Sequence, residues 1–181
     1  MGAADVTFNA KWEANQIGVH FMDGENELQV VVGDYGSKVY QISNPSKTGY
    51  TFKGWAYADG TTVTWPVTLG VDDVVVYAIW EGNDITINFY GETESDWLAY
   101  TTLKAGAELV VPADAAAPTK KGYTFVGYFD AEGNAMPATV PAQDTNYFAR
   151  FEAVTYTATF VDGDAVVGTY EGIYNSTIVK P

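Results

Sequence analysis

The heptapeptide Gly49-Tyr50-Thr51-Phe52-Lys53-Gly54-Trp55 returns 73 residues later as Gly122-Tyr123-Thr124-Phe125-Val126-Gly127-Tyr128. A second motif, Ala78-Ile79-Trp80-Glu81, returns as Ala149-Arg150-Phe151-Glu152. Duplication of this kind at a nearly fixed period is the signature of a chain built from copies of one small supersecondary unit. The repeat therefore decides the fold before any single residue does.

Two sets of aromatic landmarks agree on the length of the repeat. Each set is spaced by 68 and then 71 residues, and the sets are Phe21, Phe89 and Phe160, and Trp12, Trp80 and Phe151. These spacings predict complete repeats at residues 16–83 and 84–153. Residues 1–15 are then expected to be the C-terminal strand of an upstream repeat, and residues 154–181 the N-terminal hairpin of a truncated downstream repeat.

Each copy has the pattern of β-strands. Apolar residues alternate with polar or smaller ones in Ile17 to Phe21 and Ile85 to Phe89, which is the period of a half-buried strand. Asp23-Gly24 and Asp162-Gly163 are typical of tight hairpin turns. The sequence thus predicts a mainly β fold of tandem small modules with about four strands each. Only a short helical turn, at residues 64–67 or 135–138, would add α structure.

The repeated residues also carry a family resemblance. A Gly-Tyr-Thr-Phe-x-Gly-Trp/Tyr motif, preceded by Pro-x-Lys and followed by Tyr/Phe-Ala-x-Trp/Phe-Glu, resembles the Listeria-Bacteroides repeat, also called the internalin-type B-repeat. The resemblance covers both complete copies and both partial ones. It implies a β-grasp-like module strung in tandem on bacterial surface or secreted proteins.

Composition excludes several classes of function. The 181 residues include nine Lys plus Arg against 23 Asp plus Glu, a net charge of -14, so no basic stripe is available for nucleic acid. The chain has no cysteine, which excludes disulfides and thiolate chemistry. No apolar run is long enough for membrane insertion.

Residues with chemical potential are better explained by structure. His20, the only histidine, has no second histidine or cysteine beside it and is expected on the solvent face of its strand, between Val19 and Phe21. The Asp-Gly pairs lack the ligand spacing of a calcium loop, and Asp72-Asp73 has no partner carboxylate at a defined spacing, which favours a solvated loop. We therefore predict no catalytic, cofactor-binding or metal-binding residues, no cofactor and no enzymatic activity.

The aromatic residues leave one question open. Tyr50, Phe52 and their copies recur and are expected in the core, with a repeated sugar-stacking platform as the alternative. Trp65 and Trp97 do not recur and are the candidates for ligand binding, with core or inter-module packing as the alternative. We expect an acidic, cysteine-free stalk or spacer that is extracellular, at the cell surface, with any anchor outside these residues. Its expected partners are neighbouring repeats of the same chain. The alternative is an adhesin-like module that binds a host protein or glycan.

Overall fold

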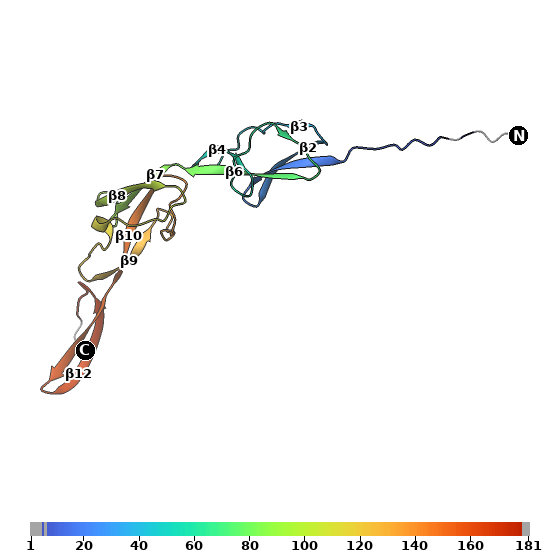
Figure 1. The fold of residues 1–181 in the computed structure, drawn as a ribbon. Coiled ribbons are helices and arrows are strands. Elements are labelled where there is room, and N and C mark those ends of the chain that lie inside the picture. The colour runs from blue at the N-terminus through green and yellow to red at the C-terminus, as the bar shows by residue number, and fades with distance from the viewer. Residues whose placement is uncertain (1–4, 6, 179–181) are drawn as a thin grey trace. The chain divides into compact units, whose positions relative to one another are not determined.

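The computed structural model describes residue 5 and residues 7–178, and Figure 1 shows the strands and turns that these residues form. The chain divides into two compact units. One contains the residues up to Lys47 together with Thr51–Glu81, and the other contains Thr48–Tyr50 and the residues from Gly82 onward.

The sheet of the first unit has four strands, β1 (Gln16–Asp23), β2 (Asn26–Asp34), β4 (Tyr50–Ala56) and β6 (Val74–Gly82). Their order is β2-β1-β6-β4. Strand β1 pairs with β2 in antiparallel fashion and with β6 in parallel. Two short strands, β3 (Lys38–Val39) and β5 (Val67–Thr68), pair with each other beside this sheet.

The second sheet repeats this arrangement with β7 (Asp84–Tyr90), β8 (Trp97–Lys104), β9 (Tyr123–Phe129) and β10 (Thr145–Ala153). The order is β8-β7-β10-β9, again with a parallel pair, β7 and β10, at the centre. The prediction of mainly β, four-stranded tandem modules is confirmed. The helical turn expected at residues 64–67 or 135–138 is absent, and the only helical element of the described residues is a 3-10 turn, η1 (Ala113–Ala115).

The two ends of the chain differ. Strands β11 (Thr155–Asp162) and β12 (Ala165–Ile173) form an antiparallel hairpin in the predicted downstream segment. At the other end, residues 5 and 7–15 form no strand, so the closing strand expected at residues 1–15 is not formed there. Residues 1–4, 6 and 179–181 of these two segments lie outside the described residues, and the predicted repeat boundaries remain a prediction.

Each core lies on one face of its sheet, and the alternation in the opening strand explains why. Val19 and Phe21 are fully buried, and so are their counterparts Ile87 and Phe89. Phe21 meets Trp55 edge to face, with 4.9 Å between ring centroids and 78° between ring planes. Such aromatic pairs add to the stability that burial alone provides.

One aromatic position of the core differs between the two repeats, and the second unit provides a hydrogen bond that suits its own residue. Tyr128 stands where the first unit has Trp55, and its hydroxyl donates a hydrogen bond of 2.7 Å to the carbonyl oxygen of Ala115 in η1. Ala115, which supplies that acceptor, is the last residue of η1 and the first of the run Ala115-Ala116-Ala117 in the loop before β9. The indole N–H of Trp55 is buried without a hydrogen-bond partner among the described residues. The longer loop of the second unit therefore supplies the hydrogen-bond acceptor that the smaller, hydroxyl-bearing ring of Tyr128 needs.

Candidate functional site

The structure places the two predicted ligand-binding tryptophans in different surroundings. Trp65 packs against the core of the first unit and stacks on Phe21, with 5.6 Å between centroids and 13° between planes. Trp97 begins β8 in the second unit and is 55% exposed. Core packing accounts for Trp65, whereas the core does not account for Trp97.

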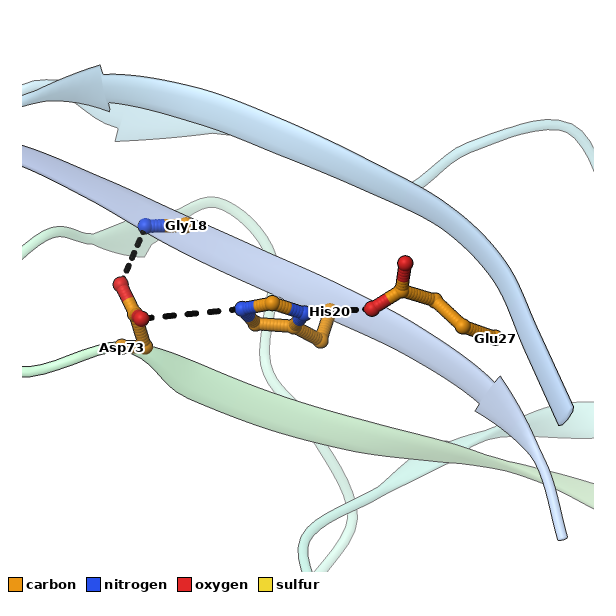
Figure 2. A network of polar contacts seen from close by, with 4 residues as sticks. All are labelled: Gly18, His20, Glu27 and Asp73. Atoms are coloured by element: carbon orange, nitrogen blue, oxygen red, sulfur yellow. Dashed lines mark hydrogen bonds and ion pairs between the residues drawn. The ribbon is translucent and has the colours of Figure 1, made fainter. Parts of the chain in front are cut away.

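A polar network that the sequence did not predict surrounds His20 in the first unit. The side chain lies on the face of β1 opposite Val19 and Phe21, which confirms the predicted orientation. Nδ1 of His20 is 2.6 Å from a carboxylate oxygen of Glu27 on β2, and Nε2 is 3.7 Å from Asp73. Figure 2 shows the imidazole between these two carboxylates.

The two carboxylates favour the charged imidazolium. The hydrogen bond to Glu27 is the main cause that raises the pKa of His20 above its usual value, and the negative charges of Glu27 and Asp73 raise the pKa further. Burial acts in the opposite direction but is outweighed. The protonated ring is hydrogen-bonded to Glu27 through Nδ1 and forms a longer ion pair with Asp73 through Nε2. The imidazolium therefore connects β1 to β2 and to the residue just before β6.

Asp73 also has a structural role that the second unit repeats. Its Oδ1 accepts a 2.7 Å hydrogen bond from the backbone N–H of Gly18. In the second unit, Oδ1 of Asp144 accepts a 2.8 Å hydrogen bond from the backbone N–H of Thr86. The sequence predicts Asp73 only as part of a solvated loop. The matching place of an aspartate just before each closing strand was the signal that could have revealed this role.

The histidine itself is not repeated. In the second unit its place is taken by Asn88, whose side-chain amide donates a 3.0 Å hydrogen bond to Asn146 on the neighbouring parallel strand. A neutral pair thus replaces a titratable one. The network of His20 contains an imidazole and two carboxylates. None of the hydrogen bonds described for it involves a hydroxyl group that could act as a nucleophile.

Each unit also contains a lysine held by a carboxylate and an aromatic ring. Lys47 lies 3.2 Å from Asp23, which also accepts a 2.9 Å hydrogen bond from the indole of Trp80. Lys120 lies 2.7 Å from Glu92 and has its ammonium 4.2 Å from the ring centroid of Tyr123. These lysines belong to the repeated Pro-x-Lys motif, so its lysine connects a loop to the sheet in both units.

Groups that could hold a metal ion and helices that could span a membrane are both absent from the described part of the chain. Within residues 5 and 7–178, no group of three or more histidine, aspartate or glutamate side chains is placed to hold a metal ion. No helix in the same part of the chain has the length and hydropathy of a membrane span.

The family model described as the Listeria-Bacteroides repeat domain matches residues 18–79 and 86–149. The matched ranges coincide closely with the two four-stranded sheets. They contain both Gly-Tyr-Thr-Phe motifs and the first residues of both Tyr/Phe-Ala-x-Trp/Phe-Glu motifs, which end at Glu81 and Glu152.

Curated relatives cover most of this chain. A putative membrane protein of Evansella cellulosilytica is 28% identical over 184 residues, which cover 97% of this chain and 27% of the relative. Internalin H of Listeria monocytogenes is 37% identical over 138 residues, covering 72% of this chain and 24% of the relative. The chain spans about a quarter of the length of these relatives.

Among solved structures, streptococcal high identity repeats in tandem (SHIRT) domains 3-4 from a cell surface protein are 16% identical, with a TM-score of 0.26. That match covers 77% of this chain and 98% of the solved chain. At this score and identity, no conclusion about the present chain rests on it.

Proposed function

Because this chain belongs to the Listeria-Bacteroides repeat domain family, we propose that it is a non-catalytic spacer in a bacterial surface or secreted protein. One observation carries the proposal. Two units with the same strand order and the same central parallel pair follow one another in the chain. Copies of one module add length to a protein without adding new chemistry.

Contacts that the two units share support a mechanical role. In both units an aspartate before the closing strand binds the backbone of the opening strand, and a loop lysine binds a carboxylate near the end of that strand. All of these contacts fasten segments that are distant in sequence. In a spacer, such contacts resist the separation of strands under load.

The charge of the chain suits an exposed array. The net charge of -14 favours solubility and discourages association between copies, although salt screens this repulsion beyond about 8 Å. Residues 16–83 and 84–153 are the proposed repeats, and further repeats are their proposed partners. The relatives named putative membrane protein and internalin H support the proposed place at the cell surface.

A second candidate function, adhesion to a host protein or glycan, is favoured by Trp97. This tryptophan is 55% exposed and has no aromatic counterpart in the first unit. Trp65, the other candidate, has a place in the core instead. Adhesion would therefore use the second unit.

Small-angle X-ray scattering tests the spacer proposal when the repeat number is varied. Proteins with one, two and four repeats should differ in maximum dimension by about 25 to 30 Å per added repeat, which is the size of a compact 70-residue module. A maximum dimension that grows only as the cube root of the mass would contradict a spacer. The same samples should show no change in secondary structure per residue by circular dichroism.

A further inference from the structure

Four aromatic residues form one cross-strand row on the sheet of the second unit. Trp97 on β8 is paired with Tyr90 on β7, Tyr90 with Phe148 on β10, and Phe148 with Phe129 on β9. Neighbouring strands lie about 4.8 Å apart, so the row extends about 14 Å across all four strands. We call these four residues the aromatic row.

The aromatic row lies on the face of the sheet opposite the core. The residues next to three of its members, Phe89, Tyr128 and Ala149, are buried in the core, so alternation directs the row to the other side. The register shifts between Phe89 and Tyr90, and this irregularity pairs the exposed Trp97 with Tyr90. A second irregularity in β9 aligns Phe129 with Phe148. Two bulges thus complete the row.

A charged hollow adjoins one end of the aromatic row. The guanidinium of Arg150 lies 4.4 Å from the ring centroid of Phe129, and no carboxylate of the described residues lies within 4.0 Å of it. Arg150 and Phe148 line a hollow of about 450 Å³ together with Glu92 and Asp130. The only arginine of the chain therefore lines the same hollow as two carboxylates and an aromatic ring.

The first unit shows that the fold does not require these residues. At the corresponding positions of its sheet the row reads Glu27, Met22, Tyr77 and Ala56, and Ile79 takes the place of the arginine. The buried core residues, by contrast, are apolar in both units. Since the same sheet forms without the aromatic row, packing does not explain why the second unit has it.

The chemistry of this surface matches a neutral sugar chain. Aromatic rings pack against the apolar C–H faces of pyranose rings, while planar guanidinium and carboxylate groups hydrogen-bond to adjacent hydroxyls. Residues 84–153 have ten acidic and four basic residues, and their net charge of -6 repels acidic polysaccharides and nucleic acid. A row of about 14 Å gives room for a short oligosaccharide.

We propose that the aromatic row and the adjoining Arg150 of the second unit form a binding site for neutral oligosaccharides. The proposal deepens the adhesion alternative by naming its site and its class of ligand, and it does not rest on the spacer role. Failure of the scattering test would leave it intact, and failure of the binding test would leave the spacer role intact.

Isothermal titration calorimetry of the whole 181-residue chain tests the site with defined probes. The neutral probes are cellohexaose, xylohexaose, mannohexaose and chitohexaose, and the acidic comparators are polygalacturonate and heparin. We expect saturable binding of at least one neutral probe with one site per chain. Trp97→Ala and Arg150→Ile should each weaken that binding at least about fivefold, since each removes a contact of the size of an aromatic pair.

The variants have matched controls in the same chain. Arg150→Ile introduces the residue that the first unit already carries on the same strand face, so the fold should tolerate it. Tyr40→Ala removes a tyrosine of the first unit that is 66% exposed and should leave the affinity unchanged. Thermal melts followed by circular dichroism check that every variant is folded. The proposal is overturned if no neutral probe binds, if acidic probes bind better, or if both site variants bind like the parent.

Discussion

The network around His20 predicts that the stability of the first unit depends on pH, and that the dependence disappears in the variant His20→Asn. The substitution copies the second unit, where Asn88 holds the same place. It keeps a hydrogen-bonding side chain on β1 but removes the titratable group. Comparing the variant with the parent therefore separates the effect of His20 protonation on stability from the effects of the rest of the sheet.

The size of the effect follows from the two ion pairs. The closer pair joins His20 and Glu27 at 2.6 Å, with side-chain exposures of 29% and 46%. The pair with Asp73 is longer, at 3.7 Å, and the carboxylate is 60% exposed. Partly exposed pairs of this kind contribute about 0.2 to 1 kcal/mol each, so we expect about 1 kcal/mol in total.

The direction follows from the raised pKa. His20 has a higher pKa in the folded unit than its ordinary value of 6.5, so the folded state binds the proton more tightly than the unfolded state does. The added stability is therefore fully present below about pH 6.5 and is lost as the pH rises through the folded-state pKa. Measurements at pH 5.5 and pH 8.5 bracket this change while the carboxylates remain ionised.

Urea unfolding followed by tryptophan fluorescence reports mainly on this unit, because Trp55, Trp65 and Trp80 all lie in it. For a domain of this size, with a slope of about 1 kcal/mol per molar urea, the midpoint should be about 1 M higher at pH 5.5 than at pH 8.5. In His20→Asn the two midpoints should coincide. Equal midpoints in the parent protein, or an equal shift in the variant, would refute the role assigned to His20.

Four further predictions concern the second unit. Asp144→Ala leaves the N–H of Thr86 without its side-chain acceptor and should cost about 0.5 to 1 kcal/mol, seen as a lower melting temperature by circular dichroism; an unchanged melt would count against the contact. Tyr128→Phe removes the hydrogen bond to Ala115 and should cost about 1 to 2 kcal/mol. In the parent, burial raises the pKa of Tyr128 to about 12, so spectrophotometric titration should find one tyrosine that resists ionisation until then. Phe89→Ala should cost about 3 to 5 kcal/mol and unfold the second unit while the tryptophan signal of the first persists; joint loss of both units would show that they are not separate.

The repeat in the sequence was sufficient to predict a mainly β fold of tandem modules with about four strands each, but not the order in which the strands pair. The alternation of Val19 and Phe21, and of their counterparts, marks the core-facing side of the opening strands directly. Two landmarks that share one period then locate the remaining strands. Local periodicity carries this information because each strand lies half in the core and half in solvent.

The pairing of strands that lie far apart in the chain could not be predicted from the sequence. Trp65 and Trp97 have the same signature, a tryptophan without a copy, and only the stacking of Trp65 on Phe21 separates them. The partners of His20 lie on β2 and before β6. The approach of Glu27 depends on the antiparallel register of β1 and β2, and that of Asp73 on the parallel register of β1 and β6. Register depends on turns and bulges, which leave little trace in a single sequence.

The aromatic row shows the same limitation more strongly. Its four residues are spread over 59 positions, from Tyr90 to Phe148 with Trp97 and Phe129 between them, and two bulges bring them into line. No periodicity of the chain connects them. Comparison of the two repeats at matching positions is what distinguishes such residues from the core.

The central claim is that the chain is a series of separately folded, load-bearing modules, and single-molecule force extension of the chain, tethered at its two ends, tests this claim most directly. The first module runs from Gln16 to Gly82 and the second from Asp84 to Ala153. At about 3.5 Å per residue, each should release about 240 Å of contour length, less its folded length, in its own step. Two such steps are the predicted result, whereas one combined step of about twice that length, or extension without resistance, would contradict the account.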